Sequence, residues 1–291
     1  MLALTTYFND CETRRQNIES FWQGLPVDVS LICAYADSKP ILFSKTRSLV
    51  GLTRSSYCLM WQKEALLNKL LKETRDLRDE FIAWLDCDVL FDNPIWPHNA
   101  RVALGTAKII QLFTWCDNGD TAKSHWRGSP NEEPGKAWAA RADVIREIGF
   151  FPFNAVGGAA AIMAHSFLTD KPDPVWSDLY TPAHLAMILD YQQKVYRAIR
   201  GNFAHIPGTL THLYHGPLKD RQYRSRHEIL KRHNYDPAKD VRINGMGCLE
   251  WCSDKPEMHR EVAEYFKNRN EDVARTEERS AGLAIEESAK V

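Results

Sequence analysis

The sequence predicts an α/β fold in which helices flank a mixed, mainly parallel sheet. Over residues 2–86, short apolar runs alternate with segments of helical spacing, in the order strand, helix, strand, helix, strand. Parallel strands need a long crossover between them, usually a helix, so this order is typical of a parallel sheet. The run EFIAWLD (80–86) is apolar with little alternation, which is typical of a strand that is buried on both faces.

The first half of the chain is expected to contain three strands and two helices. LALTTYF (2–8) is apolar and β-branched, and it ends before the turn-prone pair Asn9-Asp10. The helical stretches carry apolar side chains spaced three or four residues apart. The expected elements are strand 2–8, helix 12–24, strand 27–36, helix 61–77 and strand 80–86.

The second half is less regular. A segment rich in glycine, asparagine and proline separates two apolar runs there and predicts a surface loop. A glycine turn leads into a helix over residues 154–167, and the clearest amphipathic helix of the chain follows over residues 181–201. The expected elements are strand 107–115, loop 117–135, a strand leading into a helix over 135–151, helix 154–167 and helix 181–201.

Composition limits the classes of function. The chain has 291 residues, 44% hydrophobic and 26% charged, with a net charge of −1. This balance is typical of a globular protein, and the net charge gives no overall attraction to nucleic acid or an anionic membrane. No run approaches the roughly 18 apolar residues of a membrane span, and MLALTTYFND does not resemble a signal peptide. The seven cysteines form no CxxC pair, which favours reduced thiols and a cytoplasmic protein.

Two aspartates follow the buried strand in the sequence LDCDVLF. If the strand continues through them, Asp86 and Asp88 point to the same face and Cys87 points to the other. Two carboxylates held close together repel each other unless a cation neutralises them, and Mg²⁺ or Mn²⁺ binds one or two carboxylates together with substrate phosphates. Open α/β sheets bind ligands at the carboxyl ends of their strands. The alternative is a strand that ends in a solvated turn, because a DxD pattern is weak by itself.

A second group of polar residues lies in THLYHGPLKDRQYRSRHEIL (211–230). His212 and His215 flank a tyrosine, and four cations follow them within eleven residues: Lys219, Arg221, Arg224 and Arg226. A neutral imidazole can bind Mn²⁺, and arginine or lysine can neutralise a diphosphate. The alternative is a histidine that is satisfied in the core beside a solvated basic face.

Together these motifs resemble a glycosyltransferase of the GT-A fold, which is Rossmann-like. The residues that carry the resemblance are LTTYFN, WQKEALLN, FIAWLDCDVLF, GKAWAARADVIREIGFF and HLYHGPLKDRQYRSRHEIL. More narrowly, they are similar to glycosyltransferases of bacteriophages. The resemblance covers about residues 2–251. It implies one domain over 1–251, with a nucleotide-binding half (1–104) and an acceptor and metal half (105–251), and a helical or partly disordered tail over 252–291.

The resemblance also implies a donor site for a nucleotide sugar, most simply a UDP-sugar. Asp86 and Asp88 would hold Mn²⁺ or Mg²⁺ on the diphosphate, with His215 as a later metal ligand. The other implied donor residues are Thr5, Tyr7 and Asn9 near the base, Lys63 and Asn68 on the preceding helix, Lys219 and Arg221 near the diphosphate, and Trp138 at the sugar.

One position departs from the pattern. Similar proteins usually read GGGD or GGxD at the turn after the acceptor loop, and the aspartate is their expected general base. Here the sequence is GGAAA, with alanine at position 160, while Gly157 and Gly158 still suit close approach to a sugar. Three interpretations stay open: the chain is an inactivated variant, another carboxylate such as Asp178 or Asp190 supplies the base, or the reaction is a retaining one without such a base.

The acceptor stays open at this point. The phage resemblance suggests hydroxymethylated pyrimidines in DNA, contacted by the basic stretch 219–233 and stacked on Trp126 or Tyr223, in the host cytoplasm. A saccharide or protein acceptor is the alternative, and so are a phosphohydrolase or nuclease and a binding module without catalysis. The sequence predicts no membrane partner and leaves hexosyl or pentosyl transfer undecided.

Overall fold

The computed structural model describes residues 1–8, 11–37, 49–53, 59–118, 124–125 and 134–272. Asn9 and Trp126, which the sequence places at the nucleotide base and at a DNA base, lie outside these ranges. In the part of the chain that is described, no helix combines the length and apolar character needed to cross a membrane. The six cysteines within it are free thiols.

A seven-stranded sheet forms the centre of the molecule, in the order β10-β6-β9-β4-β1-β2-β3. Strand β9 runs antiparallel to β4 and β6, and the other neighbours are parallel. This confirms the mixed, mainly parallel sheet. Its strands are β1 (Leu2–Phe8), β2 (Ser30–Asp37), β3 (Leu49–Thr53), β4 (Phe81–Leu85), β6 (Ile109–Gln111), β9 (Ala137–Arg141) and β10 (Phe203–His205).

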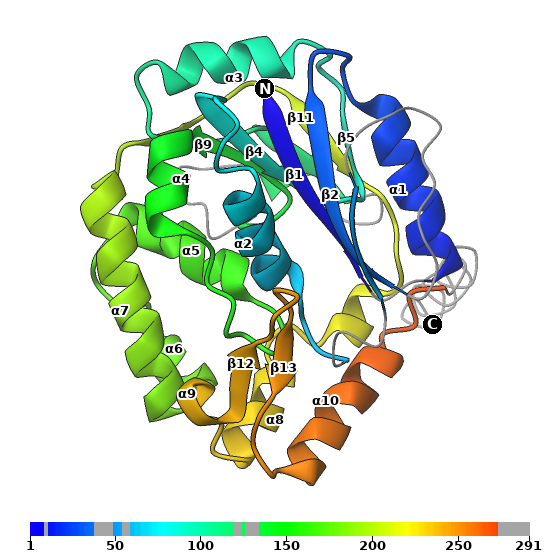
Figure 1. The fold of residues 1–291 in the computed structure, drawn as a ribbon, viewed down its shortest axis with the longest axis vertical. Coiled ribbons are helices and arrows are strands. Elements are labelled where there is room, and N and C mark those ends of the chain that lie inside the picture. Colours follow the sequence, from blue (N-terminus) through cyan, green and yellow to red (C-terminus); the bar gives the residue numbers. More distant parts are fainter. Residues whose placement is uncertain (9–10, 38–48, 54–58, 119–123, 126–133, 273–291) are drawn as a thin grey trace, which may run out of the picture.

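Helices cover both faces of this sheet (Figure 1). On one face lie α1 (Glu12–Gly24) and α3 (Trp96–Leu104), and on the other lie α2 (Lys63–Glu73), α4 (Ala142–Ile148), α5 (Ala159–Leu168) and α7 (Pro182–Ile199). The apolar spacing that predicted the helices is the buried face in the structure: Leu66 and Leu70 of α2 pack into one core cluster, and Ile18 and Phe21 of α1 pack into the other.

A second sheet has four strands in the order β5-β11-β7-β8. Its strands are β5 (Val89–Phe91), β7 (Trp115–Asp117), β8 (Ser124–His125) and β11 (Thr209–His212). The single strand predicted over 107–115 is wrong. The run is divided between two sheets, because β6 pairs with β9 and β10 whereas β7 pairs with β11 and β8.

The C-terminal part packs as a third cluster beneath the end of the main sheet (Figure 1). The amphipathic helix α10 buries Met258 and Val262 there, beside Leu230 of α8. Helix α10 lies within the stretch predicted as a tail. The elements of this part are a 3₁₀ turn (Leu218–Arg221), α8 (Arg226–Arg232), α9 (Pro237–Asp240), β12 (Val241–Ile243), β13 (Leu249–Trp251) and α10 (Pro256–Lys267). Helix α6 (Trp176–Leu179), which precedes α7, packs in a separate cluster with Phe151 and Ile188.

Candidate functional site

The two sheets bring one aspartate and two histidines together. Strand β4 ends at Leu85, and the chain turns through residues 86–88 into β5. Strand β11 pairs antiparallel with β5, so that His212 lies opposite Val89, and the amide of Leu213 donates to the carbonyl of Asp88 over 2.8 Å. His215, three residues after His212 and just before the Gly216 turn, also reaches Asp88. Ligand atoms of Asp88, His212 and His215 all lie within 4.8 Å of one another.

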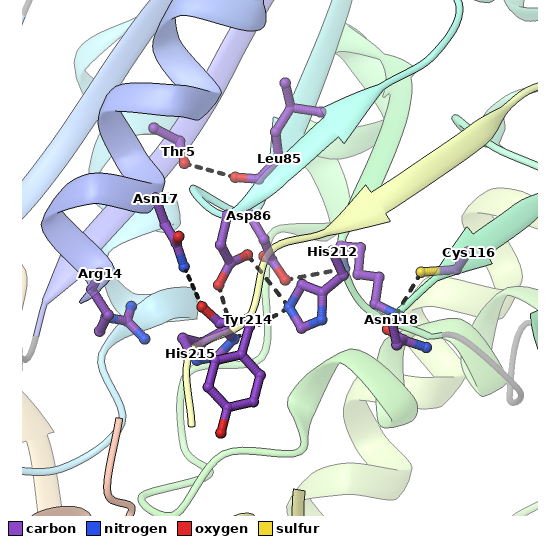
Figure 2. Close-up of polar contacts among 12 residues, drawn as sticks. Thr5, Arg14, Asn17, Leu85, Asp86, Cys116, Asn118, His212, Tyr214 and His215 are labelled. Atoms are coloured by element: carbon purple, nitrogen blue, oxygen red, sulfur yellow. Dashed lines mark hydrogen bonds and ion pairs between the residues drawn. The ribbon is translucent and has the colours of Figure 1, made fainter. Parts of the chain in front are cut away.

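The donor set of this cluster fits a divalent cation. The Oδ2 atom of Asp88 lies 3.0 Å from Nε2 of His215, and its Oδ1 atom lies 3.6 Å from Nε2 of His212. Figure 2 shows the two imidazoles turned toward each other, with their Nε2 atoms 3.2 Å apart. Oδ1 of Asp88 is buried and has no hydrogen-bond partner among the described residues. One carboxylate and two imidazoles suit Mn²⁺, and a cation would satisfy the unpaired oxygen.

Electrostatics keep this cluster ready for a cation. Burial alone would raise the pKa of Asp88, but His215 and His212 outweigh burial and hold that pKa well below its usual range. Burial lowers the pKa of His212, although Asp88 opposes this shift. The aspartate is therefore ionised, and the His212 ring tends toward the neutral form that binds metals.

Asp86 has a different environment from Asp88. Its Oδ1 accepts a hydrogen bond from the ammonium of Lys63 at the start of α2, and its Oδ2 accepts one from the amide of Lys136 over 3.2 Å. Burial lowers the pKa of Lys63, but Asp86 outweighs this and the pKa is raised. The alternation argument from the sequence fails here, because residues 86–88 form a turn and not a continued strand. The structure groups Asp88, and not Asp86, with the histidines.

Three arginines surround the cluster. The Nη2 atom of Arg221 lies 2.9 Å from Nδ1 and 2.8 Å from Nε2 of His215. On the other side of the histidine, Glu271 lies 3.6 Å from its Nδ1 and pairs with Arg14 (3.5 Å) and Arg269 (2.8 Å). Burial lowers the pKa of Arg14, but the electrostatic effects of Glu271, Asp88 and neighbouring cysteines together outweigh burial and raise it. The Arg14 guanidinium therefore stays charged beside the Asp88, His212 and His215 cluster.

All these groups open into one cavity of about 670 Å³. This volume lies within the range of pockets that hold a single small ligand. The Asp88, His212 and His215 cluster and the arginines line this cavity, together with residues from the start of α5 and from α6 and α8. Among the residues predicted from the sequence, those that line the cavity are Lys63, Asp86, Asp88, Gly158, Ala160, His215 and Arg221.

Trp138 and Gly157 lie just behind this cavity. Trp138 lines a small adjoining pocket with Lys63 and Ala160, and its indole N–H donates to the carbonyl of Pro134 over 3.1 Å. Gly157 has a φ of 86°, and a Cβ atom there would lie 3.1 Å from the Trp61 ring. Both residues therefore pack against side chains that line the cavity and do not line it themselves.

Several predicted donor residues do not reach the cavity. The hydroxyl of Thr5 donates to the carbonyl of Leu85 over 2.7 Å, and Tyr7 is buried in the core that α1 covers. Their neighbours on β1, Thr6 and Phe8, line the cavity instead. The reason is physical: β1 is buried along its whole length, so its sequence gives no sign of which alternate residues face the ligand.

Other predicted residues also have structural roles or lie on the surface. Asn68 makes two hydrogen bonds to the backbone of Phe150, donating to its carbonyl over 2.8 Å and accepting from its amide over 2.9 Å. Lys219, Asp178 and Asp190 are exposed, and none of them lines the cavity.

The structure adds residues that sequence reasoning did not assign. His212 joins His215 in the cluster, and the spacing of three residues between the two histidines in the sequence is a pattern that could have indicated this. Asp173, before α6, is the one carboxylate among the described lining residues besides the two aspartates after β4. Arg269 and Glu271 had no signal, because they follow α10 in a stretch that looked like a charged tail.

Comparison with known proteins gives a distant likeness. No protein-family model matches the chain, and no curated protein sequence matches it. Among solved structures, glucosyl-3-phosphoglycerate synthase from Mycobacterium tuberculosis in complex with Mn²⁺, UDP and phosphoglyceric acid is 13% identical, with a TM-score of 0.45 over 83% of this chain and 81% of that chain. Mannosyltransferase PcManGT from Pyrobaculum calidifontis in complex with GDP-Man and Mn²⁺ is 11% identical, with a TM-score of 0.42 over 91% and 69%. S. aureus TarS 1–349 is 10% identical, with a TM-score of 0.41 over 95% and 73%. Likeness at this level does not extend to individual side chains.

Proposed function

We propose that the protein is a metal-dependent glycosyltransferase that transfers a hexose or pentose from a nucleotide sugar, most simply a UDP-sugar, to a hydroxyl acceptor. The observation that carries the proposal is the cluster of Asp88, His212 and His215, with its unpaired buried oxygen. A phosphohydrolase or nuclease built on several carboxylates is less well supported, because the cluster found among the described residues contains a single carboxylate.

Two groups of residues would bind the donor: the Asp88, His212 and His215 cluster and the neighbouring arginines. Asp88, His212 and His215 would hold Mn²⁺ or Mg²⁺, which when bound neutralises charge on the diphosphate. Arg221 and Arg14 offer charged donors beside the histidines, and arginine suits phosphate oxygens because its N–H groups form a fixed fork. Preorganised charges of this kind stabilise a diphosphate as it leaves with new negative charge.

We place the acceptor near Ala160, at the start of α5. Alanine cannot accept the proton of an attacking hydroxyl, and Asp178 and Asp190 do not line the cavity. Apart from Asp86 and Asp88, Asp173 is the one carboxylate among the described lining residues, and we assign it as the acceptor's base. Its side chain lies 3.8 Å from Nδ1 of His165, which holds it beside α5.

Candidate acceptors include a saccharide, a protein and a hydroxymethylated pyrimidine in phage DNA, with the protein in the host cytoplasm. For DNA, the supporting observation is Tyr223, which is 54% exposed at the cavity and offers a ring for stacking on a base. The basic stretch 219–233 supports DNA less than its composition suggested, because Arg221 and Arg226 are buried and face the cavity.

The proposal is tested by measuring UDP release from UDP-hexoses and UDP-pentoses, with and without Mn²⁺. We expect slow, Mn²⁺-dependent release that Asp88→Asn abolishes. Asp143→Asn, at an exposed position in α4, is the matched control and should keep the wild-type rate. Release at the wild-type rate from Asp88→Asn, or release of inorganic phosphate without UDP, would contradict the proposal.

A further inference from the structure

The N-terminus of α5 opens into the cavity without a cap. This ten-residue helix follows Gly157 and Gly158, whose φ angles are 86° and 100°. Gly158 is the N-cap and has no side chain to cover the helix end, and the first turn contains no acidic residue. The first N–H groups of a helix have no partner within the helix, and they carry a partial positive charge. Here the amide of Ala161 donates to the carbonyl of Gly158 over 3.2 Å, and within the described part of the chain the amides of Ala159 and Ala160 make no such bond. Gly158, Ala160 and Ala161 all line the cavity, so this helix end lies at its surface.

Two side chains of α8 meet this helix end. A Cβ atom at Gly158 would lie 3.2 Å from Nε2 of His227 and 3.3 Å from Nη2 of Arg226. Both residues line the cavity, yet Arg226 is only 6% exposed and His227 only 3%. Nε of Arg226 and Nδ1 of His227 are buried and have no hydrogen-bond partner among the described residues. Native structures rarely leave such groups unpaired, so a bound ligand is expected here.

The charge at this point is positive and not neutralised. Nη1 of Arg226 lies 3.3 Å from the hydroxyl of Tyr265, and the guanidinium lies 5.2 Å from the centre of the Tyr223 ring. In the described part of the chain, no carboxylate forms an ion pair with Arg226. Burial, with the nearby Arg226 and His184, lowers the pKa of His227 to about 3, so its ring is neutral and can donate one N–H. Helix end, guanidinium and imidazole together form a set of donors that has no anionic acceptor among the described residues.

We infer that the start of α5, Arg226 and His227 form an anion subsite that binds the phosphate group of a small phosphorylated acceptor. Helix N-termini and arginine are the usual partners of a phosphate in proteins. The subsite is buried, which suits the terminal phosphate of a small molecule better than the backbone of a DNA duplex. This inference rests on the proposed function, because the donor's diphosphate is assigned there to the cluster of Asp88, His212 and His215.

The test uses the full chain saturated with Mg²⁺ and UDP, into which inorganic phosphate is titrated by calorimetry. Phosphate should bind while UDP is bound. Arg226→Gln should weaken phosphate binding by about tenfold or more, as expected for a charged hydrogen bond. Ala160→Asp should do the same, because its carboxylate repels the anion at the helix end. Arg232→Gln, at an exposed position of the same helix, is the control and should bind phosphate like the wild type.

The possible results are separable. Competition between phosphate and UDP would place the anion in the donor site and overturn the inference, as would unchanged phosphate binding in Ala160→Asp. Salt-sensitive binding of hydroxymethylated duplex DNA that Arg226→Gln removes, without binding of free phosphate, would replace the small acceptor with DNA. If Arg226→Gln does not fold, Ala160→Asp decides alone. If the proposed function itself is wrong, the result is different: the wild type would show no metal-dependent binding of UDP.

Discussion

Glu271 links the C-terminal segment to His215, and the loss of its charge has an effect on the free energy of unfolding that can be calculated. The carboxylate is 11% exposed and lies near Arg14, Arg269 and Nδ1 of His215. Burial alone would raise its pKa, but the Arg14, His215 and Arg269 groups lower it from 4.5 to about 2. One pKa unit corresponds to about 1.4 kcal/mol, so the ionised carboxylate contributes about 3 kcal/mol to the free energy of unfolding.

The sign of the pH dependence follows from the lowered pKa. The contribution of Glu271 is complete above about pH 5 and is lost as the pH falls toward 2. Glu271→Gln should therefore be less stable than the wild type by about 3 kcal/mol at pH 7, and this difference should shrink by about 2 kcal/mol between pH 6 and pH 3.

Urea unfolding at a series of pH values, followed by circular dichroism, measures this difference directly. Glu147→Gln, which removes an exposed carboxylate from α4, is the control and should lie within about 0.5 kcal/mol of the wild type at each pH. A stability difference for Glu271→Gln that stays constant from pH 7 to pH 3 would refute the assignment of this carboxylate to the arginine and histidine cluster.

Two further predictions concern the acceptor side. Gly157→Ala should lower the free energy of unfolding by about 1–3 kcal/mol, because φ is 86° and the new Cβ would lie 3.1 Å from the Trp61 ring. Urea unfolding measures this free energy, and a value equal to that of the wild type would contradict the prediction. Asp173→Asn should lower the rate of sugar transfer by about 100-fold or more and leave UDP affinity unchanged, as expected for the loss of a base. Asp178→Asn, at an exposed position, is the control, and a larger loss of transfer rate in Asp178→Asn would assign the base to Asp178.

Local patterns predicted the first part of the fold well. LALTTYF became β1, and the apolar face of residues 12–24 became α1 with the predicted bounds. These elements are determined by the spacing of their own apolar side chains. The run 107–115 failed because an apolar stretch does not show where a strand changes its partners, and here it passes from one sheet to another.

The site could be predicted only in outline. Asp88 is recognisable in the sequence because it follows an apolar strand, and His215 because a glycine turn follows it. The sequence did not reveal which residues of β1 line the cavity. Thr6 and Phe8 line it, but their residue types do not distinguish them from Thr5 and Tyr7. A strand that is apolar along its whole length gives no information about its faces.

Contacts between distant segments had even less signal. Glu271 reaches His215 only because α10 packs against the third core cluster and returns the chain to the metal ligands. Arg226 and His227 meet Gly158 through the packing of α8, sixty-odd residues further along the chain. Such juxtapositions are set by tertiary packing, which no local pattern in the sequence encodes.

The proposed function requires that Asp88, His212 and His215 hold a divalent cation for a nucleoside diphosphate. Electron paramagnetic resonance of free Mn²⁺, titrated with the protein in the presence and absence of UDP, tests it directly. The wild type should bind Mn²⁺ more tightly with UDP present, and Asp88→Asn should weaken Mn²⁺ binding by at least about tenfold while Asp143→Asn leaves it unchanged. Mn²⁺ binding by Asp88→Asn that equals the wild type would contradict the account.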